Sequence, residues 1–286
     1  MPETDNRTKQ SVLPDVRGSK LNIHRMGEGE PLLFLHGAQG LSGNEPGLDA
    51  LASHFDVIAP DHPGFGRSED SELVDDVRDL ALFYLDLLDE LALEQVHVVG
   101  HCIGGWVALE MAVASSGRFN SLVLVNSAGI RLKGVPRGDM FLSSEDDLLK
   151  LLFAHDGAEW LKRWRATPEL EEIYDRNRAA AAKLSWSPRL CNPKLDRWLH
   201  RIDVPTHIIH QRGVFRGAEA GMVGGNDIET AGERGEPRLS SIESLGAMQK
   251  QQRLALAHAM DIELAAPHGE EPVLLRPVIG FGHGSR

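Results

Sequence analysis

A short strand-to-helix turn at residues 100–105, with the sequence Gly-His-Cys-Ile-Gly-Gly, constrains the fold more than any other part of the chain. It directly follows an apolar run and directly precedes residues 106–112, a good helix former. In such a turn the central residue adopts a strained backbone conformation, and small residues two positions before and after it prevent collisions between neighbouring segments. Gly100 and Gly104 occupy those positions. The pattern therefore predicts a nucleophile elbow that presents Cys102.

Strands and helices alternate through the part of the chain that surrounds this turn. Short apolar runs predict strands at residues 32–35, 57–59, 96–99, 121–125 and 206–209. Apolar residues recur at spacings of four and three from Leu73 to Leu91, which predicts an amphipathic helix capped by Ser71. Acidic residues near its start, among them Asp76, are interpreted as its solvated face. This order predicts an α/β fold with a mostly parallel sheet flanked by helices.

The pattern changes after residue 130. Up to about residue 202 it is helical without intervening strands, and Thr167-Pro168 is a helix start signal. We interpret this segment as a helical lid inserted over the carboxyl edge of the sheet, where open α/β sheets bind ligands. Beyond residue 210 the periodicity fades, so the C-terminal part of the fold is degenerate. The predicted organisation is a polar N-terminal extension at 1–20, a first core part at 21–130, the lid at 131–202 and a second core part at 203–286.

Charge and composition exclude several classes of partner. The formal net charge of −12 argues against nucleic-acid binding, which needs clustered Lys and Arg. The first twenty residues lack an apolar signal region, and no run is long enough to span a membrane, so a cytoplasmic protein without a membrane partner is expected. The Cys and His spacing does not match a zinc site, and no metal or organic cofactor is implied. A small-molecule substrate is expected, and the sequence leaves a homodimer open.

The two cysteines have different expected roles. A thiol at a helix N-terminus or beside an imidazolium can have a lowered pKa, so Cys102 is expected to supply a thiolate that attacks an acyl carbonyl. The alternative is a buried, unreactive cysteine that happens to follow a strand. Cys191 is interpreted as an inert buried thiol.

Several motifs resemble the capped branch of the α/β-hydrolase superfamily, which includes esterases, haloperoxidase-like proteins and carbon–carbon bond hydrolases. They are Leu-Leu-Phe-Leu-His-Gly at 32–37, Asp-His-Pro-Gly-Phe-Gly-Arg-Ser at 61–68, the elbow, and Arg-Ile-Asp-Val-Pro-Thr at 201–206. The resemblance covers about residues 20 to 210. Cys102 stands where most members have serine, although dienelactone hydrolases use a Cys-His-Asp triad.

The resemblance implies a function and an oxyanion hole. It implies hydrolysis of an ester, thioester or carbon–carbon bond of a small, partly apolar substrate through an acyl-enzyme on Cys102. The backbone N–H groups of Ala38 and Ile103 would be the oxyanion donors. His36 and His62 are expected to order their own loops through hydrogen bonds, and His101 to pack rather than to catalyse.

The acid and base of the triad are ambiguous in this sequence. The family normally shows Gly, two variable residues and Asp after its next strand, but this chain has Gln-Arg-Gly-Val at 211–214. One alignment puts Ala247 in the histidine position and breaks the triad. A second alignment makes Asp227 the acid and His268 the base, and His283 is a third candidate for the base.

The lack of a clear acid and base has a different explanation if residues from about 211 onward derive from a frame-altered or decayed coding sequence. The chain would then be a catalytically impaired or non-catalytic protein that binds a ligand in its pocket without turning it over.

Overall fold

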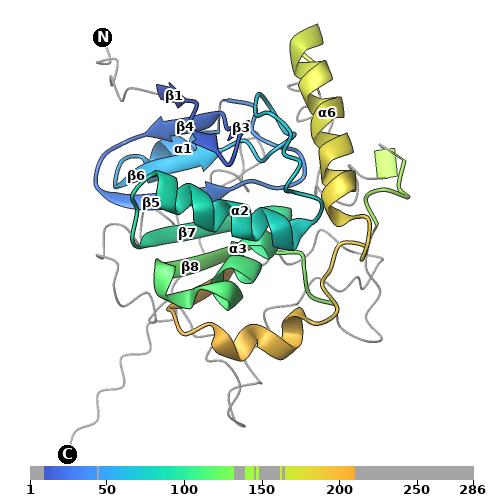
Figure 1. Cartoon of the computed structure of the whole chain (residues 1–286). Coiled ribbons are helices and arrows are strands. Elements are labelled where there is room, and N and C mark those ends of the chain that lie inside the picture. The colour runs from blue at the N-terminus through green and yellow to red at the C-terminus, as the bar shows by residue number, and fades with distance from the viewer. Residues whose placement is uncertain are drawn as a thin grey trace, which may run out of the picture.

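The computed structural model describes residues 10–43, 45–131, 139–144, 146–147, 162 and 165–209. These residues form a seven-stranded sheet in the order β1-β4-β6-β5-β7-β8-β9 (Figure 1). Its strands are β1 (Gln10–Val12), β4 (Ile23–Met26), β5 (Glu30–Leu35), β6 (Phe55–Pro60), β7 (Val96–His101), β8 (Phe119–Val125) and β9 (Thr206–Ile209). Strands β5 to β9 run parallel, and β1 and β4 join antiparallel at one edge. The mostly parallel sheet expected from the sequence is confirmed.

The sheet extends further toward the N-terminus than the strands that the sequence predicts. Strand β1 pairs with β4 through the register Ser11 to His24, and β4 pairs with β6. A separate two-stranded ribbon, β2 (Asp15–Val16) and β3 (Ser19–Lys20), lies between β1 and β4 in the chain.

Helices cover both faces of the sheet because its central strands are apolar on both faces. Along β5, Leu33 and Leu35 join the core that includes α2 (Val77–Glu90) and α3 (Ile103–Ala114). Leu32 and Phe34 of the same strand point to the other face, in the core that includes α1 (Pro46–Leu51). Successive side chains of a strand alternate between faces, which produces the two cores. In Figure 1, α2 and α3 lie in front of the sheet.

The start of helix α2 differs from the sequence prediction. The helix begins at Val77, and its N-cap is Asp76, whose carboxylate accepts hydrogen bonds from the backbone N–H groups of Arg78 and Asp79 at 2.8 and 2.9 Å. The predicted cap, Ser71, instead accepts a hydrogen bond from the backbone N–H of Leu73 in the preceding loop. Interpreting Asp76 as part of a solvated face was therefore wrong, because a carboxylate at this position satisfies two free helix amides.

The described part of the segment 131–202 contains one long helix and one 3-10 helix. Helix α6 (Pro168–Ser185) starts where the Thr-Pro signal predicts, with the Thr167 hydroxyl accepting from the backbone N–H of Leu170. A 3-10 helix, η2 (Leu195–Arg201), follows it before β9. In Figure 1, α6 stands beside one end of the sheet.

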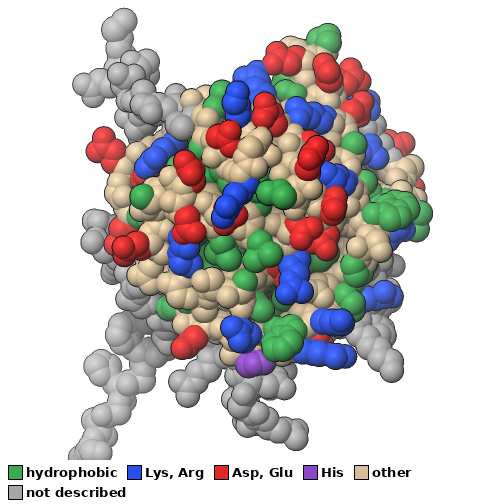
Figure 2. Space-filling view, in the orientation of Figure 1, with side chains coloured by type: hydrophobic (Ala, Val, Ile, Leu, Met, Phe, Trp, Pro, Cys, Tyr) green, Lys and Arg blue, Asp and Glu red, His purple; other side chains and the backbone are tan. Residues whose placement is uncertain are grey.

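The described residues include no helix that combines the length and the apolar character needed to cross a membrane. On the face of the molecule drawn in Figure 2, Lys and Arg side chains are interspersed with Asp and Glu side chains and do not gather into one patch.

Candidate functional site

The backbone at Cys102 has the strained conformation predicted for an elbow. Cys102 directly follows β7 and is the N-cap of α3, with φ of 52° and ψ of −114°. This left-handed φ is uncommon for a residue with a side chain and must be held by its surroundings. The Cys102 N–H donates to the carbonyl of Val125 at 2.9 Å, and its carbonyl accepts from the N–H of Ala128 at 3.0 Å. These bonds tie the elbow to the end of the neighbouring strand β8.

The glycines on either side of the elbow are required by close backbone approach. A Cβ at Gly100 would lie 2.6 Å from the carbonyl oxygen of Gly104, and a Cβ at Gly104 would lie 2.1 Å from the carbonyl oxygen of Leu35. Because both obstacles are backbone atoms, neither could move aside cheaply. The folded backbone therefore requires glycine at both of these positions, as the sequence predicts.

Two backbone amides converge on the thiol of Cys102. The backbone N–H groups of Ala38 and Ile103 both act on the thiol to lower its pKa. Ile103 is the first residue of α3, so its N–H has no acceptor within the helix. Ala38 lies in the turn after β5, which the N–H of Gly40 closes by donating to the carbonyl of Gly37 at 3.1 Å. These are the two amides that the family resemblance implies as oxyanion donors.

The ionisation of Cys102 differs from the expectation. Burial raises the pKa of this thiol, and the backbone amides of Ala38 and Ile103 lower it by less, so the net pKa lies above the ordinary value. The helix N-terminus alone does not lower the pKa of Cys102, because the loss of solvation outweighs the two amides, and the imidazole expected beside the thiol lies outside the described residues. The residue is nevertheless only half-buried, so it is not sealed in the core. Cys191 is buried, as predicted.

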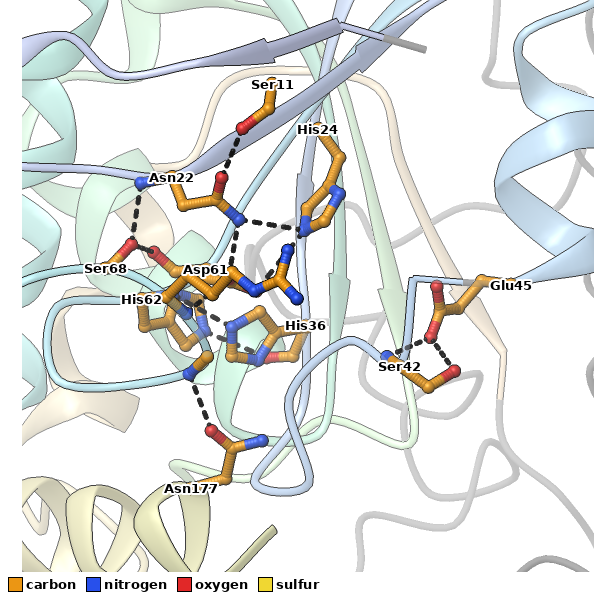
Figure 3. A network of polar contacts seen from close by, with 12 residues as sticks. Ser11, Asn22, His24, His36, Ser42, Glu45, Asp61, His62, Ser68 and Asn177 are labelled. Carbon is orange, nitrogen blue, oxygen red and sulfur yellow. Dashed lines mark hydrogen bonds and ion pairs between the residues drawn. The ribbon is translucent and has the colours of Figure 1, made fainter. Parts of the chain in front are cut away.

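Two buried imidazoles link the loops after β5 and β6 (Figure 3). The Nε2 atom of His36 accepts from the backbone N–H of His62 at 3.0 Å, and Nε2–H of His62 donates to the backbone carbonyl of His36 at 3.0 Å. The remaining nitrogens bind the carbonyl of Gly37 and the hydroxyl of Tyr84. The prediction that these histidines order their loops is confirmed.

Both imidazoles are neutral. Burial lowers the pKa of His62 to about 4, and burial together with the neighbouring His62 lowers the pKa of His36 well below its ordinary value. With all four ring nitrogens engaged, neither ring is free to take a proton from Cys102.

The site geometry agrees with the comparisons with known proteins. A family model described as the alpha/beta hydrolase fold matches residues 30–203. The chain belongs to the alpha/beta hydrolase fold family.

Relatives in this family include proteins with two different activities. The chain is 36% identical over 151 residues to the dihydrolipoyllysine-residue acetyltransferase component of the acetoin cleaving system of Cupriavidus necator, a match that covers 50% of this chain and 40% of that protein. It is 38% identical over 124 residues to the 2-hydroxymuconate semialdehyde hydrolase of Pseudomonas sp. strain CF600, which covers 40% of this chain and 42% of that protein. The chain thus spans less than half the length of these relatives.

A solved structure supports the fold assignment. The meta-cleavage product hydrolase of Pseudomonas fluorescens IP01 superposes with a TM-score of 0.51 at 25% identity, covering 70% of this chain and 78% of that chain.

The loop 61–68 of this alpha/beta hydrolase fold protein is organised around the buried carboxylate of Asp61 (Figure 3). Asp61 Oδ2 accepts from the Asn22 side-chain amide at 2.8 Å and from the backbone N–H of Arg67 at 3.0 Å, and His24 Nε2 lies 3.6 Å from Oδ1. Burial raises the pKa of Asp61, but His24 and these donors outweigh it, so the net pKa lies below the ordinary value. The carboxylate is therefore charged at neutral pH and holds this loop together.

His101 lies beside Gly37 at the elbow. A Cβ on Gly37 would lie 2.9 Å from His101 Nδ1 and 3.2 Å from the Cβ of Cys102, so this ring and the elbow both lie against Gly37.

The described residues do not include the predicted acid and base. Asp227 and His268, as well as Ala247 and His283, lie outside the part of the chain that the structure describes. Within residues 10–209 as described, the groups that lower the pKa of the Cys102 thiol are the amides of Ala38 and Ile103. In the same residues no group of three or more His, Cys, Asp or Glu side chains could hold a metal ion.

Two residues of α6 that the sequence did not single out contact the loops of the site. Arg176 on α6 donates to the carbonyls of Gly66 and Ser68, at 2.9 Å to Gly66. Its neighbour Asn177 contacts both the turn after β5 and the loop 61–68. Nothing in the sequence marks these residues, because polar side chains on a helix usually face solvent.

A groove of about 280 Å³ lies between α6 and the loop after β6. It is lined by Pro63, Gly64, Asp70, Val74, Arg176, Ala179, Ala180, Lys183 and Leu184. Neither the elbow nor the turn that carries Ala38 contributes to this lining, so the groove is separate from the Cys102 thiol.

Proposed function

We propose that this protein is a hydrolase that cleaves an ester, thioester or carbon–carbon bond of a small, partly apolar substrate through an acyl-enzyme on Cys102. One observation carries the proposal: Cys102 lies at a strained elbow between β7 and α3, where the backbone amides of Ala38 and Ile103 act on its thiol. The semialdehyde hydrolase and the meta-cleavage product hydrolase to which the chain is similar support a hydrolytic reaction.

The proposed chemistry requires two acyl-transfer steps. In the first, the sulfur attacks the substrate carbonyl carbon, and the carbonyl oxygen becomes an oxyanion that accepts hydrogen bonds from Ala38 and Ile103. The oxyanion collapses, the bond to the leaving group breaks, and the proton from the thiol goes to that group. In the second step water attacks the thioester, its proton returns to the sulfur, and the acid product leaves.

Both steps need a proton acceptor: in the first the thiol of Cys102, whose pKa burial raises, must lose its proton, and in the second the attacking water must lose one. We propose His268 for this role, oriented by the carboxylate of Asp227, which is the division of labour in other triads. His36 and His62 are poor candidates because their ring nitrogens are already bonded and their pKa values are lowered.

A second candidate is a non-catalytic member of the family that binds a ligand at the same place. The raised pKa of Cys102 favours it, since a protonated thiol without a base is a weak nucleophile. This candidate corresponds to a decayed segment after residue 210.

A pre-steady-state assay separates the two candidates. With p-nitrophenyl acetate as substrate, the hydrolase should release a burst of p-nitrophenol close to one equivalent of protein, and Cys102→Ala should abolish it. Cys191→Ala is the matched control, because Cys191 is buried and should leave the burst unchanged. Folded protein that gives no burst would support the binding candidate.

The variant Cys102→Ser tests the base. A serine hydroxyl needs a general base far more than a thiol does. If His268 and Asp227 assemble beside position 102, the serine variant should retain measurable esterase activity. An inactive serine variant with slow activity in the parent protein would mean that no base is present.

A further inference from the structure

A fully buried amide on the lid contacts the turn that carries Ala38. Asn177 of α6 has no exposed surface. Its Nδ2–H donates to the carbonyl oxygen of Gln39 at 2.6 Å, and its Oδ1 accepts from the backbone N–H of Gly66 at 2.8 Å. Figure 3 shows the side chain between α6 and the loops of the site. One side chain thus satisfies two backbone groups from two different loops.

The turn is fitted closely around this amide. Gly40 has a φ of +79°, and a Cβ there would lie 2.2 Å from Asn177 Nδ2. Residues 37–40 form a single turn, in which the N–H of Gly40 donates to the carbonyl of Gly37. The contact with Gln39 therefore fixes a turn of only four residues, and the amide of Ala38 lies in the same turn.

We propose that Asn177 is a positioning residue for the oxyanion hole: from the lid helix it holds the turn 37–40 so that the N–H of Ala38 points at the sulfur of Cys102. The catalytic part of this inference rests on the proposed function. The mechanical part, which couples α6 to the surroundings of the thiol, does not, and it can be measured without any substrate.

The neighbouring residue supplies a matched control. Arg176 anchors the same helix, but its guanidinium donates to Gly66 and Ser68 and not to the turn 37–40. If any contact between α6 and the site loops were enough to set the pKa of Cys102, Arg176→Ala and Asn177→Ala should change that pKa equally. If the contact between Asn177 and Gln39 sets the pKa of the Cys102 thiol, only the substitution at Asn177 should change that pKa. Asp175→Ala, an exposed position on α6, controls for changes to the helix itself.

The test is the pH dependence of Cys102 alkylation by iodoacetamide, followed on the Cys102 peptide by mass spectrometry. The Ala38 amide lowers the pKa of this thiol, so its displacement in Asn177→Ala should move the profile to higher pH by about one unit. Arg176→Ala and Asp175→Ala should keep the parent profile. A folded Asn177→Ala protein with the parent profile, or an equal shift in Arg176→Ala, would overturn the inference.

Two further measurements keep the test decisive. If Asn177→Ala does not fold, as judged by circular dichroism, Asn177→Ser leaves a smaller cavity and should shift the profile in the same direction. In the ester assay, Asn177→Ala should lower kcat about tenfold with little change in KM, since only the transition state uses the amide of Ala38. A parent protein without ester activity whose alkylation profile still shifts in Asn177→Ala would refute the proposed function and keep the coupling.

Discussion

The imidazoles of His36 and His62 each bond to the other residue's backbone, one as acceptor and one as donor, both at 3.0 Å. This reciprocal pair joins the ends of β5 and β6 and leaves Ala38 two residues beyond the junction. It requires the His36 ring to be neutral, because a protonated His36 could no longer accept from the N–H of His62, and burial lowers the pKa of His62 to about 4. The site is therefore built on two histidines that do not titrate in their ordinary range.

The neutral pair predicts a loss of stability on mild acidification. The pKa of His62 is lowered from 6.5 to about 4, so below pH 6.5 the unfolded chain binds a proton that the folded protein does not. Stability therefore falls as pH decreases from 6.5 toward 4, by roughly 2 kcal/mol at pH 5 for this residue. Urea unfolding at pH 7 and pH 5 measures the change. His62→Gln, which can also donate and accept, should reduce the difference between the two pH values; an unchanged difference would contradict this account.

The loss of stability caused by replacing a glycine with alanine should depend strongly on the position of the glycine. Gly104→Ala places a Cβ 2.1 Å from the backbone oxygen of Leu35, so it should destabilise the protein by more than about 3 kcal/mol or prevent folding. Gly117 is the matched control, because a Cβ there meets nothing within 4 Å. Thermal unfolding of the two variants should separate them clearly. Equal melting temperatures would mean that the backbone does not approach as closely at Gly104 as the structure shows.

The cap of helix α2 gives a third prediction. Asp76→Ala removes the acceptor for two helix amides and should cost about 1 kcal/mol in the free energy of unfolding. Asp75→Ala alters an exposed carboxylate one position earlier and should be nearly neutral. Denaturant unfolding measures both. A larger effect at Asp75 would place the start of the helix elsewhere.

The parts of the fold that the sequence predicts are those set by local patterns. The strands follow from apolar runs, and the elbow follows from two glycines around Cys102, since a strand, a tight turn and a helix are adjacent in the chain. Helix α6 likewise starts at its Thr-Pro signal.

The parts that the sequence missed depend on groups far apart in the chain. Asn177 contacts Gln39 across 138 positions, and no periodicity identifies such a pair. The raised pKa of Cys102 depends on how the folded chain excludes water from the thiol, whereas the sequence shows only the helix N-terminus that opposes it. The start of α2 was misplaced because Ser71 and Asp76 are both good caps, and only the backbone path distinguishes them.

The central claim is that Cys102 becomes acylated, and trapping that species tests it most directly. The parent protein, mixed with p-nitrophenyl acetate and quenched in acid within its first turnover, should carry one acetyl group, which peptide mass spectrometry should locate on Cys102. Cys102→Ala should carry none, and Cys191→Ala should be labelled like the parent protein. Turnover of the ester without acetylated Cys102, or equal labelling in Cys102→Ala, would contradict the account.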